Sequence, residues 1–210
     1  MRVLVGIPVL YNGNVCLKAF KSVIDEADLL IIDNGSEPDV KEAIKEIYNS
    51  NFPRVKVVEF YKNEYVNPAW NEIISQFLLY RDYDQLVIMN SDIIMQSGWS
   101  KYLVDGVSCI PNDGSVKIDT ETFEGNAGVF IHLNKEMARL VYPIPDSIRV
   151  WYGDAFIQRK LYNAGYKQVI KAGMICEHVH GGSVTVKRLP EFQEIIKQDM
   201  IAWETIKETI

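Results

Sequence analysis

The fold is decided by residues 3–36, which read VLVGIPVLYNGNVCLKAFKSVIDEADLLIIDNGS. Val3 to Leu10 is a nearly unbroken apolar run, as expected for a strand that is covered on both faces. Apolar residues then recur at helical spacing from Val15 to Ala27. A second apolar run, Leu29 to Ile32, ends at Asp33-Asn34-Gly35-Ser36. This β-α-β pattern predicts parallel strands joined by right-handed crossovers.

The same alternation continues to about residue 92. Helices are expected over Pro38 to Tyr48 and after Asn67-Pro68, where Asn67 resembles an N-cap and Pro68 a first helical residue. Strands are expected over Arg54 to Tyr61 and Leu86 to Met89. The fold class predicted from this order is α/β, with a mainly parallel central sheet flanked by helices.

After residue 100 the alternation changes. Strands are expected at Cys109-Ile110, Ala127 to Leu133 and Gln168 to Ala172, and a helix from about Asp154 to Ala164. The tail from about 190 to 210 is amphipathic, with an apolar stripe of Phe192, Ile196, Met200, Trp203 and Ile206. We expect this stripe to pack on the core; a partner or membrane-surface helix is the alternative, which the acidic residues there disfavour. The predicted organisation is one domain, residues 1–210, with a first half to about 100, a second half from about 101 to 185 and a C-terminal helix.

Composition narrows the classes of partner. The chain has 210 residues, 48% of them hydrophobic, with 22 Lys and Arg against 28 Asp and Glu, a formal charge of −6. This acidic balance argues against a nucleic-acid partner. No apolar run approaches ~18 residues, so no membrane span is expected, and the N-terminus reads as structure rather than as a signal peptide. Three widely spaced cysteines argue against a disulfide framework, and reduced thiols indicate a cytoplasmic protein.

Ligands of open parallel sheets collect beyond the carboxyl ends of the strands. Asp33 and Asp92 fall there by counting along the chain. Such carboxylates can bind a ribose hydroxyl, a base N–H or a divalent cation. The alternative for residues 33–36 is an ordinary Asx turn or β-turn, and for Asn90-Ser91-Asp92 it is a helix N-cap cluster.

Several motifs, in order, resemble the GT-A fold nucleotide-sugar glycosyltransferases of the large inverting family two. They are Ile-Pro-Val-Leu-Tyr-Asn (7–12), Leu-Leu-Ile-Ile-Asp-Asn-Gly-Ser (29–36), Asn63 with Ala69 and Asn71, Ile-Met-Asn-Ser-Asp (88–92), Gly-Asn-Ala-Gly (125–128), Trp-Tyr-Gly-Asp (151–154) with Ala-Gly-Tyr (164–166), and Glu-His-Val-His-Gly-Gly-Ser (177–183). The resemblance covers residues 3 to about 185. It implies a Rossmann-like GT-A fold with a nucleotide-sugar half followed by an acceptor and metal half.

The resemblance also implies a reaction: inverting, divalent-metal-dependent transfer of a sugar from a nucleoside diphosphate sugar, most commonly UDP-linked in this family, to an acceptor hydroxyl on a carbohydrate or glycan. Asp92 with His178 and His180 would hold Mn²⁺ or Mg²⁺, with the choice between the two histidines open. Asp154 would be the general base. The donor contacts would be Pro8, Tyr11, Asp33, Asn71, Ser91 and Asp92, and the acceptor contacts Trp151, Tyr152 and Gly128. Gly181-Gly182 would let backbone N–H groups approach the phosphates.

The sequence departs from the family pattern at three positions. Asn90 replaces the first carboxylate of the Asp-x-Asp metal motif, Gly153 stands where the Glu before Asp154 is usual, and Glu64 replaces a frequent glycine. These departures support an alternative, a non-catalytic nucleotide-sugar-binding module. A sugar nucleotidyltransferase is disfavoured, because residues 8–14 hold one glycine and no lysine or arginine. The short acceptor-side region leaves open that the chain is one module of a larger glycosyltransferase.

Individual residues also have structural alternatives. Asp154 fits a helix N-cap, and Trp151 and Tyr152 fit packing at a sheet edge. Asn71 fits a polar position on an amphipathic helix, and Asn63 fits a turn. For the two histidines the alternative is a polar loop without a ligand.

Overall fold

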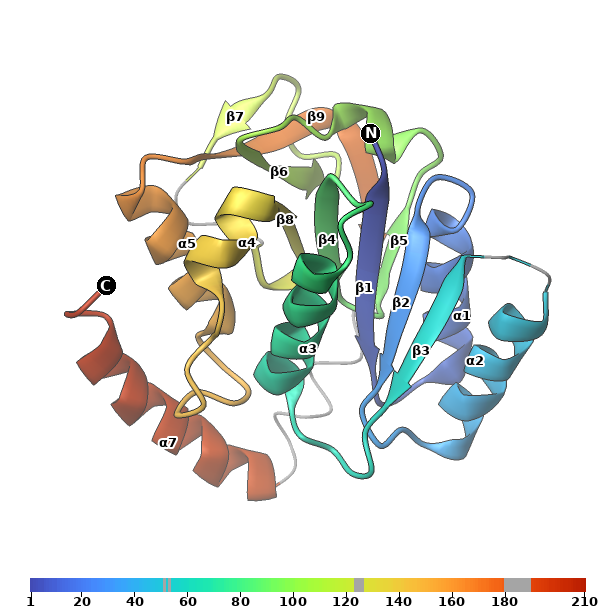
Figure 1. The fold of residues 1–210 in the computed structure, drawn as a ribbon, viewed down its shortest axis with the longest axis horizontal. Coiled ribbons are helices and arrows are strands. Elements are labelled where there is room, and N and C mark those ends of the chain that lie inside the picture. Colours follow the sequence, from blue (N-terminus) through green and yellow to red (C-terminus); the bar gives the residue numbers. More distant parts are fainter. Residues whose placement is uncertain (51, 53, 123–126, 180–189) are drawn as a thin grey trace.

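A five-stranded sheet forms the centre of the computed structural model, which describes residues 1–50, 52, 54–122, 127–179 and 190–210 (Figure 1). Its order is β3-β2-β1-β4-β8. The four parallel strands are β1 (Val3–Val9), β2 (Asp28–Asp33), β3 (Val55–Glu59) and β4 (Gln85–Met89), and β8 (Phe130–Asn134) is antiparallel to β4. Strand order reverses between β1 and β4, so the crevice expected for a ligand lies at their carboxyl ends.

Helices cover both faces of this sheet. One face carries α1 (Gly13–Val23) and α2 (Pro38–Asn49), and the other carries α3 (Val66–Leu79), α4 (Lys135–Val141) and α5 (Gly153–Asn163) (Figure 1). Alternate residues of β1 enter opposite cores: Val5 and Ile7 pack toward α1 and α2, whereas Leu4 packs toward α3. The sequence prediction of an α/β fold with a mainly parallel, helix-flanked sheet is therefore confirmed.

A second sheet, of order β5-β9-β6, lies beside the first. It comprises β5 (Ile93–Met95), β6 (Val107–Asn112) and β9 (Lys167–His178), with the two-residue β7 (Thr120–Glu121) also paired to β9. Single 3₁₀ turns, η1 (Trp99–Tyr102) and η2 (Ala127–Val129), precede β6 and β8. The antiparallel register between β5 and β9 sets Ile93 opposite His178. This register brings the end of β9 next to Asp92, the residue that precedes β5.

Several local predictions differ from the structure, and the strand expected from Ala127 begins only at Phe130, after the 3₁₀ turn η2. The N-cap of α3 is Tyr65, at φ 72°, because Asn67 lies in the first turn and donates from its side chain to the carbonyls of Ile148 and Trp151. Strand β9 extends far beyond the predicted residues 168–172, because its pairing with β5 and β6 carries it to His178.

The C-terminal helix, α7 (Pro190–Ile206), packs on the α3 and α5 side of the molecule. Phe192 is buried and Trp203 packs against the core, as predicted. Met200 does not follow the predicted stripe, since it is 48% exposed, and Asp199 beside it is 1% exposed. The buried face of α7 is thus centred on a carboxylate, whose partners are described below.

The described helices include none that is both long and apolar enough to cross a lipid bilayer. The three cysteines, Cys16, Cys109 and Cys176, are all unpaired thiols.

Candidate functional site

A cavity of about 380 Å³ lies at the carboxyl ends of β1 and β4. This is the reversal of strand order at which open α/β sheets bind ligands. Its lining comes from the segments after β1, β2 and β4, the start of α3, the turn before β8, the start of α5 and the first turns of α7: Pro8, Val9, Leu10, Tyr11, Asn34, Asn63, Tyr65, Val66, Trp70, Asn90, Ser91, Asp92, Gly128, Val129, Val150, Trp151, Gly153, Asp154 and Phe192. Segments far apart in the sequence thus converge on one space.

Asp92 is the buried carboxylate of this cavity. The side-chain Oδ2 lies 3.4 Å from Nε2 of His178, and Oδ1 is buried without a hydrogen-bond partner in the described part of the chain. The backbone holds both residues in place, because Val179 N–H donates to the Asp92 carbonyl at 2.8 Å, next to the β5–β9 pairing. A strand, not a helix, follows Asp92, so the helix N-cap alternative for residues 90–92 is wrong.

These two side chains fit part of a divalent-metal site. An unpaired buried oxygen is costly unless a ligand supplies the missing interaction, and carboxylate with imidazole is a donor set that Mn²⁺ accepts. Within the described ranges, no group of three or more His, Cys, Asp or Glu side chains is gathered that could hold a metal alone. Substrate phosphates and water commonly complete such sites. His180, Gly181 and Gly182 lie outside the described residues.

The predicted donor contacts divide into two groups. Pro8, Tyr11 and Ser91 line the cavity with Asp92. Asp33 and Asn71 are not part of its lining. The Asn71 amide bonds both backbone groups of Ile144, donating at 2.9 Å and accepting at 2.8 Å.

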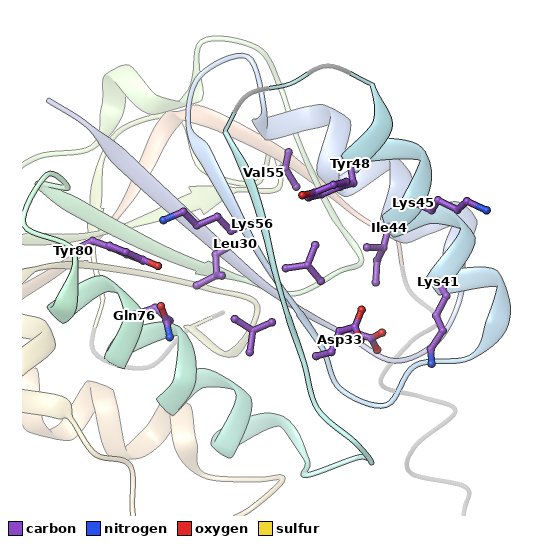
Figure 2. Close-up of a pocket in the computed structure, with 13 residues that line it drawn as sticks. Leu30, Asp33, Lys41, Ile44, Lys45, Tyr48, Val55, Lys56, Gln76 and Tyr80 are labelled. Atoms are coloured by element: carbon purple, nitrogen blue, oxygen red, sulfur yellow. The ribbon is translucent and has the colours of Figure 1, made fainter.

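Asp33 stabilises a turn at the end of β2. Its Oδ1 accepts at 2.7 Å from the backbone N–H of Ser36, three residues on, so the side chain closes a turn over residues 33–36. The residue borders a different cleft, of about 600 Å³, along the edge strand β3 (Figure 2). In that cleft the side chains of Lys45 and Lys56 lie on opposite sides of β3 and point apart, so its cations do not converge on a common ligand (Figure 2).

Sequence reasoning missed the part that Asn34 plays. Its amide donates to the Tyr65 carbonyl at 3.0 Å and accepts from Glu64 N–H at 2.9 Å. Asn63 Oδ1 accepts from the Tyr65 N–H at 2.8 Å, as expected of a turn former. Together these bonds hold the backbone of Tyr65 at φ 72°, in the left-handed region. Tyr65 itself lines the cavity. Backbone strain of this kind gathers at functional sites.

Asp154 lines the cavity from the first turn of α5. Its Oδ1 accepts from the next backbone N–H, Ala155, at 2.8 Å, and the N-cap is Tyr152, so the N-cap alternative for Asp154 is wrong. A methyl group added at Gly128 would lie 2.8 Å from Asp154 Oδ2. Gly128 therefore leaves the space that this carboxylate occupies. The first turn of a helix is also a favourable position for a negative charge.

The two predicted acceptor aromatics have different surroundings. Trp151 is 37% exposed and lines the cavity. Tyr152, at φ 63°, stacks on Trp203 of α7 with ring centroids 5.5 Å apart and planes 9° apart. Trp151 is therefore the ring that a ligand in the cavity can reach.

The unusual Gly153 has a packing explanation. A methyl group there would lie 2.1 Å from Oδ1 of Asn67, whose amide holds the carbonyls of Ile148 and Trp151. A glutamate could not occupy the position without displacing α3 from α5. The departure from the family pattern thus accompanies a contact that orders this side of the cavity.

The charged side chains of the cavity lining are all acidic among the described residues. The described lining residues include the carboxylates Asp92 and Asp154 and neither lysine nor arginine. Cys16 lies under this region, with Sγ 3.4 Å from the Tyr11 carbonyl, and burial raises the pKa of its thiol to about 11. Cys16 is therefore a neutral thiol at neutral pH. Because the described lining carries carboxylates and no lysine or arginine, an anion bound in the cavity would need a cation from solution.

The doubly wound sheet, whose strand order reverses between β1 and β4, is the fold of the GT-A glycosyltransferases. The chain belongs to glycosyl transferase family 2, whose model matches residues 5–126, more than half of the chain.

Solved structures share the fold. GalNAc-T7, crystallised with UDP, GalNAc and Mn²⁺, aligns with a TM-score of 0.73 and 14% identity over 86% of this chain and 44% of its own. TarS 1-349 of S. aureus aligns with a TM-score of 0.66 and 10% identity over 100% of this chain and 73% of its own. The chain thus spans less than half the length of the GalNAc-T7 chain. No match was found among curated proteins.

Proposed function

We propose that this domain is an inverting, divalent-metal-dependent glycosyltransferase that moves a sugar from a UDP-sugar to a hydroxyl of a carbohydrate acceptor. The observation that carries the proposal is Asp92, whose buried Oδ1 lacks a partner among the described residues while Oδ2 faces His178 at 3.4 Å. The family membership supports glycosyl transfer. The UDP and Mn²⁺ in the structure of GalNAc-T7 support the donor and the ion by analogy of fold.

Asp92 and His178 would hold Mn²⁺ or Mg²⁺, with imidazole favouring Mn²⁺ in affinity. When bound, such an ion supplies positive charge to the departing diphosphate. This positive charge would have to come from the ion, because no lysine or arginine is present in the described lining of the cavity. We propose that His180 belongs to the same site.

Asp154 is the proposed general base. It accepts the proton of the acceptor hydroxyl while that oxygen forms a bond to the anomeric carbon, and the bond from that carbon to the diphosphate oxygen breaks with its electron pair going to UDP. Attack from the face opposite the leaving group inverts the configuration. Asp154 lines the cavity from the start of α5 and Asp92 from the segment after β4, so separate elements supply the two carboxylates, which supports this division of roles.

The remaining site residues are proposed to bind the donor or the acceptor, or to shape the cavity. Pro8, Tyr11 and Ser91 are proposed donor contacts because they line the cavity beside Asp92. Asp33 is proposed to act on the donor by holding the turn that carries Asn34 into the cavity. Trp151 offers an exposed ring face on which an acceptor sugar can stack.

The test is release of UDP from a panel of UDP-hexoses (glucose, galactose and their N-acetylated amines), with methyl glycosides as acceptors and Mn²⁺ present. We expect acceptor-stimulated release that EDTA stops and added Mn²⁺ restores. Asp92→Ala should abolish it, because the ion loses its carboxylate ligand. Asp82→Ala, which removes an exposed carboxylate before β4, is the matched control and should leave turnover unchanged.

Two outcomes would contradict the proposal. Undiminished turnover in EDTA would exclude the role of the metal. Thermal stabilisation by UDP with Mn²⁺, without hydrolysis or transfer of any donor, would identify a binding module instead, since a ligand stabilises the native state without being consumed.

A further inference from the structure

Helix α7 reaches the candidate site through a buried carboxylate. Asp199 is 1% exposed. Its Oδ1 accepts from the backbone N–H of Arg149 at 3.0 Å, and its Oδ2 accepts from Val150 at 2.7 Å and Trp151 at 2.8 Å. One side chain therefore takes up three successive backbone donors of the segment that leads to Asp154.

The same segment is held from its other side by α3. Asn67 donates its backbone N–H to the Arg149 carbonyl at 2.9 Å and its side-chain amide to the carbonyls of Ile148, at 3.2 Å, and Trp151, at 3.1 Å. Asp199 thus accepts from the N–H groups of Arg149, Val150 and Trp151, and Asn67 donates to the carbonyls of Ile148, Arg149 and Trp151. The segment has no helix or strand of its own, so these two side chains define its conformation.

Two aromatic contacts extend the hold of α7. Trp203, one turn beyond Asp199, stacks on Tyr152. Phe192, two turns before Asp199, lines the cavity and meets the ring of Tyr65 edge-on at 5.9 Å. The three residues lie on one face of α7, because positions i, i+7 and i+11 coincide on a helix. This face contacts Tyr65, the segment 149–151 and Tyr152, and its first turns reach the cavity through Phe192.

A carboxylate is a costly way to pack a helix. Burying a charge carries a desolvation penalty, and an apolar residue at the same position can be equally stabilising or more so. Charge-assisted hydrogen bonds have strict distances and directions, however, and so impose a specific geometry on their partners. The use of Asp199 at this position is therefore explained better by placement of residues 149–151 than by stability alone.

We infer that Asp199 is a positioning residue for sugar transfer: it fixes the segment 149–151 and through it sets Trp151 and Asp154 relative to the acceptor hydroxyl. The inference rests on the proposed function of Asp154 as the base. Asp199 and the segment that it holds both lie outside residues 5–126, so this device is not part of the region that the family model matches.

The test is Asp199→Asn, which keeps the shape of the side chain but turns an NH₂ group toward backbone donors. We expect acceptor-dependent kcat to fall on the order of 100-fold, since misplacement of about 1 Å has that effect on a reacting pair. The affinity for UDP with Mn²⁺ should stay within about twofold, because the donor contacts lie on other segments. Trp203→Leu, a milder change that removes the stack on Tyr152, should lower the same kcat with the same unchanged affinity.

Asp28→Asn is the matched control. Asp28 is also a buried carboxylate, 3% exposed, and it binds Arg2 and Tyr83 at the opposite end of β2. The substitution Asp28→Asn should lower thermal stability and leave the kinetics of transfer unchanged. The inference is wrong if Asp199→Asn resembles Asp28→Asn, with lower stability but wild-type turnover.

Amide hydrogen exchange supplies a measurement that does not depend on turnover. Exchange at residues 149–151 should be faster in Asp199→Asn than in the wild type and unchanged in Asp28→Asn. Equal protection in all three proteins would overturn the inference whatever the kinetics. If the wild type transfers no sugar, the proposed function fails, whereas the exchange data still decide whether Asp199 fixes the segment.

Discussion

Three carboxylates at this site have different surroundings, and the surroundings indicate their roles. Asp92 is buried with one oxygen unpartnered in the described structure, which suits a ligand from outside the chain. Asp154 makes a single bond to the adjacent backbone and lines the cavity, which suits a group that accepts a proton. Asp199 has both oxygens engaged by backbone donors, which suits a group that holds its neighbours in place.

At the residue scale, Asp154→Asn should separate binding from transfer. The amide fills the same space beside Gly128 but cannot accept the acceptor's proton, so transfer should fall by about 10²-fold or more. Binding of UDP with Mn²⁺, measured by calorimetry, should be unchanged. Asp146→Asn, an exposed carboxylate in the preceding loop, is the control. Near-normal transfer by Asp154→Asn would show that another group is the base.

At the scale of elements, two contacts assemble the site. The antiparallel pairing of β5 with β9 brings His178 to Asp92, although 86 positions separate them in the sequence. The approach of α3 to α5 places Asn67 against Gly153 and orders the segment before Asp154. Each contact unites one residue of the first half with one of the second, so neither half contains a complete site.

The α3–α5 contact predicts the effect of Gly153→Ala. The added methyl would lie 2.1 Å from Asn67 Oδ1, so we expect a loss of about 1–3 kcal/mol in the free energy of unfolding, as for an overpacked core. In an Asn67→Ala background the same substitution should cost nearly nothing, because alanine is the better helix former. A double-mutant cycle in urea measures this coupling. Additive losses would show that the clash is not the cause.

At the scale of the whole molecule, His132 joins the two sheets. The residue lies on β8 and is fully buried, with Nδ1 accepting from Cys109 N–H of β6 at 3.2 Å and Nε2 2.8 Å from the Gln85 Oε1 of β4. Burial lowers the pKa of His132 from its ordinary 6.5 to about 4. The neutral imidazole is therefore the form that the folded protein requires.

This state predicts how stability depends on pH. The unfolded chain takes up a proton at His132 below about pH 6.5, whereas the folded protein does so only near pH 4. The free energy of unfolding should therefore fall as the pH drops through this window, by up to about 3 kcal/mol from this group. His132→Gln, which keeps a donor and an acceptor, should reduce that slope between pH 7 and 5 in urea titrations. An identical slope in both proteins would exclude the histidine as its source.

Local sequence patterns predicted much of this architecture. The apolar runs and helical spacings of residues 3–92 predicted the succession of strands and helices along the chain, because hydrophobic period and burial are properties of short segments. Counting along the chain then placed Asp92 at the strand ends, and Gly128, Trp151 and Asp154 were chosen from motif resemblance. All four residues line the cavity. Asp33 and Asn71 are not in its lining, and each bonds to the backbone of another residue, so their role as donor contacts stays a prediction.

The amino-acid sequence by itself determined the α/β class, the strand and helix order of the first half and the edge of the sheet where chemistry gathers. The resemblance already grouped His178 with Asp92, but only the tertiary structure showed the strand register that joins them, the contact of Asn67 with Gly153 and the bonds by which Asp199 holds residues 149–151. The physical reason is that hydrophobic period is local, whereas these contacts join residues about 50 to 86 positions apart through strand register and helix packing. A short sequence pattern around either residue of such a contact does not indicate which distant residue it will meet.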